Sequence, residues 1–261
     1  MSADFDPLAI PHEQRKDYKY EGPEVIYSFW AKHGPCQVTG CGHRTPIMTS
    51  PVMAVKTLTV KHWAHTCGKC GNDFDVEEDA ARMAPDAPLV VAPNENPYSV
   101  FDRKKGVCCP HCGHAEMVNL GKGKNKKVKL SLLVHPKWLA GEAKQDATGA
   151  PYGGSAQDDM EATKRWDAVR AAKIRLLEVR GTLPDEVTDP ETGLTFAPEK
   201  GTVPKRSNFA CGACGTVQDV LTAVKASGKT GPMAAYAVQG YAPKRDAAGK
   251  PYSGRFFAAY D

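Results

Sequence analysis

Eight cysteines stand in four close pairs, and each pair is followed at once by a glycine. The pairs are Cys36 with Cys41, Cys67 with Cys70, Cys109 with Cys112, and Cys211 with Cys214. Two thiolates on one metal ion lie about 3.7 Å apart when each zinc–sulfur bond is about 2.3 Å long, and a tight turn achieves that separation. Glycine suits the end of such a turn because it adopts a positive φ without strain. The pairs therefore indicate four zinc knuckles, enough for two four-sulfur zinc sites.

Other uses of cysteine fit these pairs less well. A disulfide framework goes with an even count and an exported chain, but Cys108 makes nine cysteines and the N-terminus lacks the apolar stretch of a signal peptide. Cys109-Pro-His-Cys112 has the letters of a thiol-redox pair, yet three similar pairs need the same explanation. Iron in place of zinc stays open, because tetrahedral sulfur suits both metals.

Two closed sulfur sites would be structural. Four sulfurs complete a tetrahedron and leave no position for the water that a catalytic zinc activates, so we expect no zinc hydrolysis and assign no catalytic residue. Four histidines stand near the knuckles, and we expect them beside the sites or in solvent. They are His43, His65, His111 and His114.

Four knuckles can share two ions in three ways. The simplest arrangement joins neighbours along the chain, so that Cys36, Cys41, Cys67 and Cys70 hold one ion and the other four hold the second. The main alternative joins the second knuckle to the third and leaves the first to meet the fourth.

The elements that position these cysteines are expected to be mainly strands, with some helix. Leu, Ile, Val and Phe make up only about 18% of the chain, so we expect small cores stabilised by metal. The expected organisation is two zinc ribbons, the second with a long insertion that carries one helix. Its boundaries are an N-terminal lead at 1–25, ribbon one at 26–80, a proline-rich connector at 81–106, and ribbon two at 107–261 with the helical insertion at about 131–208.

Periodicity predicts the individual elements. Strands are expected at 25–30, within 46–65 and at 128–134, and strands or short elements at 217–225, 233–241 and 254–260. The one helix is predicted after the turn at 153–154: Ser155 to Asp158 resembles a capping box, and Gly181 is a natural end. Its apolar stripe consists of Trp166, Val169, Leu176 and Leu177.

Charge and hydropathy narrow the environment. The formal net charge is +4, which permits a nucleic-acid partner without requiring one. No apolar run is long enough to span a membrane, and unpaired thiols with no signal peptide predict a cytoplasmic protein. Ten basic residues are candidate phosphate contacts, of which the lysines at 122–129 are expected in a glycine-rich hairpin turn. They are Lys122, Lys124, Lys126, Lys127, Lys129, Arg103, Lys104, Lys105, Lys205 and Arg206.

Several stretches outside the knuckles resemble the zinc-ribbon region of the large adenine-specific DNA methylases that contain a zinc ribbon, some of which accompany bacterial anti-phage gene clusters. Tyr27-Ser-Phe-Trp30 leads into the first knuckle, and Pro46-Ile-Met follows it. Further similar stretches, spread over most of 26–257, are His135-Pro-Lys-Trp-Leu139, Glu178-Val-Arg-Gly-Thr-Leu-Pro184, Gly201-Thr-Val-Pro-Lys-Arg-Ser207, Tyr236-Ala-Val-Gln-Gly-Tyr241 and Gly254-Arg-Phe-Phe257.

The resemblance implies transfer of a methyl group from S-adenosylmethionine to adenine in DNA, but only by a complete parent enzyme. That chemistry uses an Asp/Asn-Pro-Pro-aromatic loop that holds the flipped base. The nearest match is Asn96-Pro97-Tyr98, one proline short and inside the connector, and no glycine-rich turn joins a strand to a helix for the cofactor. We expect a region that does not methylate alone.

The expected function is therefore a DNA-binding zinc-ribbon region of such a methyltransferase, as a fragment or a separate subunit. Its partners would be DNA and the remainder of the methylase or a catalytic subunit. The alternative from the residues is a zinc-stabilised protein–protein interaction module. A thiol oxidoreductase is the third, and it would show a reactive Cys109 and little metal.

Overall fold

The chain is mainly strand, as the sequence predicts. The computed structural model describes residues 11–17, 24–39, 41, 43–118, 123–136, 174–226, 233–241, 244–245, 251–252 and 254–260. Within these ranges the helical elements are the 3-10 helix η2 (His12–Asp17) and the α-helix α2 (Val220–Ala226). Neither has the length and apolar character needed to cross a membrane.

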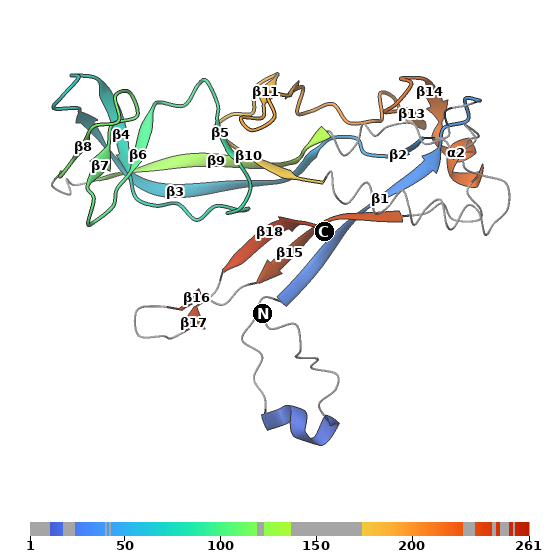
Figure 1. Ribbon diagram of the computed structural model, residues 1–261, viewed down its shortest axis with the longest axis horizontal. Coiled ribbons are helices and arrows are strands. Elements are labelled where there is room, and N and C mark those ends of the chain that lie inside the picture. The colour runs from blue at the N-terminus through green and yellow to red at the C-terminus, as the bar shows by residue number, and fades with distance from the viewer. Residues whose placement is uncertain are drawn as a thin grey trace.

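A six-stranded mixed sheet forms the long body of the molecule (Figure 1). Its strands, in spatial order, are β5 (Leu89–Val91), β10 (Leu176–Arg180), β9 (Lys124–Val134), β3 (Val52–Thr66), β4 (Asp73–Glu77) and β6 (Tyr98–Val100). The two outer pairs, β5 with β10 and β4 with β6, are parallel, and the inner pairs are antiparallel.

A four-stranded sheet packs against one face of this body. Its order is β18 (Arg255–Ala259), β15 (Met233–Tyr241), β1 (Glu24–Pro35) and β2 (Arg44–Pro46). Side chains of both sheets meet in one apolar cluster, with Leu130 and Leu132 from β9 against Tyr236 and Ala237 from β15. This cluster is the largest of the cores among the described residues.

The other strands of the described residues form four two-stranded hairpins. They are β7 (Val107–Cys108) with β8 (Ala115–Glu116), β11 (Val187–Thr188) with β12 (Thr195–Phe196), β13 (Asn208–Ala210) with β14 (Val217–Asp219), and β16 (Lys244–Arg245) with β17 (Pro251–Tyr252). The β7–β8 hairpin lies at one end of the long body and β13–β14 at the other (Figure 1).

The predicted helix is wrong where it can be compared. Leu176 and Leu177 lie in strand β10, and the described part of the expected insertion, 131–136 and 174–208, contains no α-helix. All five residues of β10 are buried because both faces of the strand are covered, and a strand buried on both sides reads as a continuous apolar run. Trp166, Val169 and the capping residues lie outside the described residues.

The predicted strands at 25–30, within 46–65 and at 128–134 are confirmed as parts of β1, β3 and β9, and those near 233–241 and 254–260 as β15 and β18. Of the lysines expected in a turn, Lys124, Lys126, Lys127 and Lys129 belong instead to β9, which begins at Lys124. The expected connector contributes two strands, β5 and β6. The long sheet thus joins strands from both sides of the expected ribbon boundary.

Candidate metal centres

Two groups of four cysteines come together, each with its sulfur atoms within 4.8 Å of one another. Site A consists of Cys36, Cys41, Cys211 and Cys214, and site B of Cys67, Cys70, Cys109 and Cys112. In site A the Sγ atoms of Cys36 and Cys214 are 3.7 Å apart, and those of Cys41 and Cys211 are 3.8 Å apart. In site B the Cys67–Cys112 and Cys70–Cys109 separations are both 3.7 Å.

The expectation that neighbouring knuckles share an ion is wrong, and the alternative arrangement is the observed one. Strand β3 explains the difference. Its fifteen residues, at about 3.4 Å each, carry the chain about 50 Å from the first knuckle to the second. Strand β9 then returns antiparallel beside it. The second knuckle therefore meets the third at one end of the sheet, and the first meets the fourth at the other.

The three knuckles with two residues between their cysteines share one backbone geometry. In each, the amide of the first cysteine donates to the carbonyl five residues on, and the glycine amide donates back to the first cysteine. For Cys67 these N···O distances are both 3.0 Å, and the same pair of bonds occurs at Cys109 and Cys211. The glycines Gly71, Gly113 and Gly215 have φ of 73°, 70° and 72°. Their positive φ is the reason glycine ends each pair.

At site A, Gln218 on β14 holds the two knuckles together. Its Nε2 donates to Cys36 Sγ over 2.8 Å, while its Oε1 accepts from the amide of Gln37 over 2.7 Å. On the other side of the site the amide of Gly212 donates to Thr45 Oγ1 over 2.8 Å. Helix α2 packs on β1 beside this site, where a Cβ on Gly34 would lie 2.8 Å from the backbone of Ala223.

At site B, Glu116 on β8 has the corresponding role. Its carboxylate lies 3.2 Å from His65 Nε2 and accepts from the amide of Gly68 over 3.3 Å. The bond from His65 lowers the pKa of Glu116, so the carboxylate is ionised. Sequence reasoning missed Gln218 and Glu116 because each supports a knuckle that is distant in the chain.

The thiols of a metal-free site differ in acidity. In site A, hydrogen bonds from the hydroxyl and then the amide of Thr216 lower the pKa of Cys214 to about 6, while burial raises the pKa of Cys41 to about 12. In site B, burial opposes ionisation of Cys109, but the amides of His111 and Cys112 outweigh it and lower its pKa to about 7. Four thiolates so close together therefore require a cation, and binding one releases protons.

The donor sets fit a tetrahedral metal ion. A tetrahedron with bonds of about 2.3 Å has edges of about 3.7 Å, which is the spacing of the sulfur pairs. Each site could thus hold one ion, and all four of its positions would be filled by sulfur. Such an ion can hold two hairpins together but offers no position to a substrate.

The four histidines and Cys108 lie outside both tetrads. The backbone carbonyls of His43 and His114 accept from the amides of Cys36 and Cys109. His111 Nε2 is 3.3 Å from the carbonyl of Asp73, and His65 contacts Glu116. Cys108 is exposed, and its Sγ lies 3.5 Å from the carbonyl of Gly113.

The candidate phosphate contacts do not form one surface. Arg103, Lys104 and Lys105 are exposed in the turn before β7, next to site B, whereas Lys205 and Arg206 are exposed before β13, next to site A. Among the described lysines of β9, Lys124, Lys127 and Lys129 are exposed. Lys122 lies outside the described residues.

Lys126 points to the face opposite to that of Lys127 and Lys129, and it is paired. Its Nζ lies 3.4 Å from Asp75 Oδ2, 3.5 Å from Glu77 Oε1 and 3.4 Å from Glu95 Oε2. Arg180 joins this cluster through Glu77 at 2.6 Å. Lys126 is therefore a structural charge and a poor candidate for binding phosphate.

Asn96-Pro97-Tyr98 serves the fold. Tyr98 begins β6, and its ring lies under the guanidinium of Arg180 at 3.8 Å from the ring centre. The carbonyl of Pro97 accepts from the amide of Asp75. These contacts hold the tripeptide against β4.

The β11–β12 hairpin repeats the knuckle geometry without cysteine. The amide of Asp189 donates to the carbonyl of Leu194, the amide of Gly193 donates back to Asp189, and Gly193 has a φ of 69°. Thr188, the residue before Asp189, pairs with Thr195. The residues before Cys67, Cys109 and Cys211 likewise pair with the residue seven positions further along the chain. Cysteine spacing could not reveal this hairpin, although the glycine marks it.

Two basic side chains contact Asp189, which stands at the position that the first cysteine has in a knuckle. Arg175 Nη2 is 3.0 Å from Asp189 Oδ1, and His135 Nε2 is 3.1 Å from Oδ2. His135 and Asp189 are both fully buried. An ion-pair cluster thus stabilises this hairpin.

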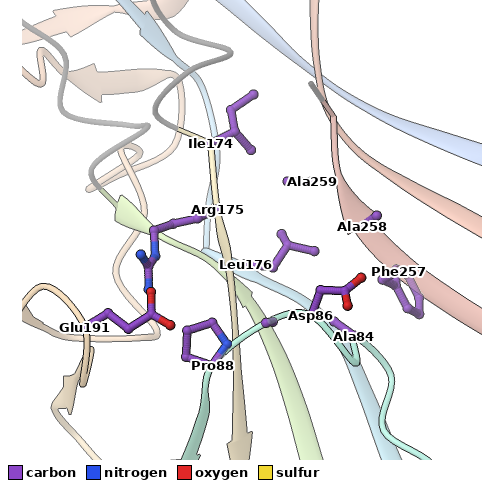
Figure 2. A pocket seen from close by; sticks show the side chains of 11 residues that line it. Ala84, Asp86, Pro88, Ile174, Arg175, Leu176, Glu191, Phe257, Ala258 and Ala259 are labelled. Atoms are coloured by element: carbon purple, nitrogen blue, oxygen red, sulfur yellow. The ribbon is translucent and has the colours of Figure 1, made fainter.

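A small cavity lies between the two sheets near this cluster. Its volume is about 220 Å³, below the roughly 300 Å³ of typical ligand pockets. Figure 2 shows Arg175 and Glu191 on one wall, with Phe257 and Ala258 on the other. The arginine is already paired with Glu191 at 2.9 Å, so the cavity carries no sign of a catalytic site.

No model of a protein family, no curated protein and no solved structure matches this chain.

Proposed function

We propose that the chain is a zinc-stabilised, DNA-binding region of an adenine-specific DNA methyltransferase of a bacterial modification or anti-phage system, and that it does not methylate by itself. The observation that carries the metal-dependent part is the pair of four-cysteine clusters with sulfur separations of 3.7 and 3.8 Å. The methyltransferase assignment rests on the similar sequence stretches around the knuckles.

Zinc is the proposed metal because it accepts four thiolates in a tetrahedron without redox chemistry. A reducing cytoplasm would keep all eight ligands as thiols before the metal binds. The closed sites make the ions structural, so methyl transfer belongs to the remainder of the methylase or a catalytic subunit. S-adenosylmethionine would bind there.

The DNA-binding part is supported by lysines of the long sheet that are exposed and form no ion pair with any described carboxylate. Lysine ammonium groups bind phosphates as point charges, which gives affinity that falls with salt and carries little sequence information. A net charge of +4 agrees with contact to a polyanion.

The test is binding of the zinc-loaded chain to a fluorescent 30-base-pair duplex, measured by anisotropy at 50 mM and 200 mM salt. We expect binding at 50 mM that weakens at 200 mM, and no methyl transfer from radiolabelled S-adenosylmethionine. If no affinity is measurable even at 50 mM salt, the DNA-binding role is wrong.

A protein-docking role has one specific observation in its favour. Strand β1 exposes four large apolar side chains, with Val25 at 66%, Tyr27 at 64%, Trp30 at 50% and Ile26 at 42%. Exposed apolar groups concentrated on one strand mark an interaction surface. We propose the catalytic part of the enzyme as its partner.

This second role predicts that Tyr27→Ser with Trp30→Ser weakens capture of a separately expressed catalytic part while DNA affinity is unchanged. The matched control is Val217→Ser with Leu221→Ser, two exposed apolar residues beside site A that leave β1 intact. If the β1 variant still captures the catalytic part as well as the wild type, β1 is not the docking strand.

A further inference from the structure

The two faces of the long sheet differ in charge and cover. Directly paired residues of antiparallel strands point to the same face, so Val60, Lys126 and Glu77 share the face that packs on the smaller sheet. The opposite face is covered at both ends. Trp63, Phe74 and Phe101 form an apolar cluster near site B, and Leu133 and Val179 form another beneath the β11–β12 hairpin.

Between these covered ends the opposite face is open. Its centre is formed by four cross-strand pairs of β3 and β9: Lys61 with Asn125, Thr59 with Lys127, Thr57 with Lys129, and Val55 with Ser131. All but Ser131 are exposed. We call Lys61, Lys127 and Lys129, with Thr57, Thr59 and Asn125, the lysine strip.

The lysine strip is positive and has no internal counter-charge. None of its six residues is acidic, and none of the described carboxylates forms an ion pair with Lys61, Lys127 or Lys129. This contrasts with Lys126, one residue away on the covered face, whose charge is shared among three carboxylates. The positive charge of the strip is therefore available to a partner.

The spacing of the strip suits a linear polyanion. Lys127 and Lys129 are two residues apart, about 7 Å along the strand, and Lys61 lies diagonally across from Lys127 at a similar distance. The three lysine positions span about 14 Å along the strands. Threonine hydroxyls and the Asn125 amide between them can donate further hydrogen bonds to phosphate oxygens.

We propose that the lysine strip is the surface that contacts the phosphate backbone of duplex DNA. This rests on the DNA-binding function proposed above and assigns it to one face of β3 and β9. The hairpins at both ends of the strip, including the site B knuckles, stand beside the bound duplex. The metal ions thus fix the borders of the surface without contacting DNA.

The test compares two triple variants that remove the same charge. K61Q/K127Q/K129Q removes the strip, and K32Q/K200Q/K225Q removes three exposed lysines that lie outside the strip and outside the candidate phosphate contacts. We expect the strip variant to lose at least tenfold in duplex affinity at 50 mM salt. Its slope of log affinity against log salt should fall by about 2.7, or about 0.9 for each lost phosphate contact. The control variant should stay within about threefold of the wild type.

Zinc content and thermal melting equal to the wild type show that both variants are folded. If the strip variant binds as tightly as the wild type, or if the control loses as much as the strip variant, the assignment of the surface is wrong while DNA binding stands. If the wild type itself shows no salt-dependent binding, the proposed function fails and the surface with it.

Discussion

Single side chains outside the tetrads hold the knuckles of each site together. Gln218 lies on the strand after the fourth knuckle and donates to Cys36 Sγ in the first knuckle. Its side chain also accepts from the amide of Gln37, beside Cys36. Groups that bond to metal ligands commonly change metal affinity by 10- to 100-fold. Gln218 is therefore the residue whose loss should affect site A alone.

Gln218→Ala should release the site A metal at least tenfold faster to a competing chelator, because Cys36 loses its donor and the first knuckle loses a bond to β14. Release from site B should be unchanged. The measurement is the rate of colour change of a zinc indicator. Gln37→Ala is the matched control, since that side chain bonds only to the carbonyl of Pro35; equal rates for the two variants would contradict the assigned role.

Asp189 should make stability depend on pH. Burial raises its pKa, but the amide of Glu191, the hydroxyl of Thr192 and the charges of Arg175 and His135 outweigh burial and lower it below 3.8. The folded pKa lies below the unfolded one, so the stabilisation is present above about pH 4 and is lost as pH falls through the folded value.

Asp189→Asn should cost about 2 kcal/mol at pH 7, because it removes the charged acceptor that Arg175 and the amide of Glu191 bond to. Its stability should then fall less steeply than that of the wild type between pH 4 and 2. Urea denaturation across this range gives both values. Asp185→Asn, at an exposed position just before β11, should match the wild type. If the stability of Asp189→Asn fell with pH as steeply as that of the wild type, the role of Asp189 would be refuted.

At the scale of elements, the length of β3 decides which knuckles meet. Strands β1, β3, β9, β15 and β18 were predictable because their apolar residues alternate or run together between turn residues. The pairing of the knuckles was not predictable, because the alternation in 46–65 indicates a strand but not that the strand runs for fifteen residues without a break. Strand β10 was mistaken for helix because burial on both faces erased its alternation.

Neighbouring lysines of β9 should behave differently because they point to opposite faces. Lys126→Gln leaves Glu77 and Glu95 with Arg180 as their cation and removes the lysine partner of Asp75. Because the lysine side chain is 22% exposed, the expected loss is about 1–2 kcal/mol. Lys127→Gln should change stability by less than about 0.5 kcal/mol. Urea denaturation tests both, and equal losses would show that the assignment of faces is wrong.

At the scale of the molecule, two four-cysteine clusters lie at the ends of a long sheet, in a chain whose content of Leu, Ile, Val and Phe is low. The eight ligands could be predicted from the sequence because their spacing has a direct geometric cause. The aspartate hairpin, Gln218 and Glu116 could not, because their roles depend on contacts between distant segments.

Removing metal should therefore disturb the ends of the molecule first. A structural zinc site contributes about 10–16 kcal/mol of apparent binding free energy, more than the net stability of a typical domain. Chelation should expose the amides of β7–β8 and β13–β14 to hydrogen exchange before those of β9. If chelation left the exchange rates of both hairpins unchanged, or raised those of β9 equally, this order would be wrong.

The most direct test of the account is the number of zinc ions per chain, measured by native mass spectrometry on two double variants and the wild type. Because the first knuckle shares its ion with the fourth, the wild type should carry two ions, Cys41→Ser/Cys211→Ser one, and Cys41→Ser/Cys67→Ser none. Fewer than two ions in the wild type would contradict the account. So would no ion in Cys41→Ser/Cys211→Ser together with one ion in Cys41→Ser/Cys67→Ser.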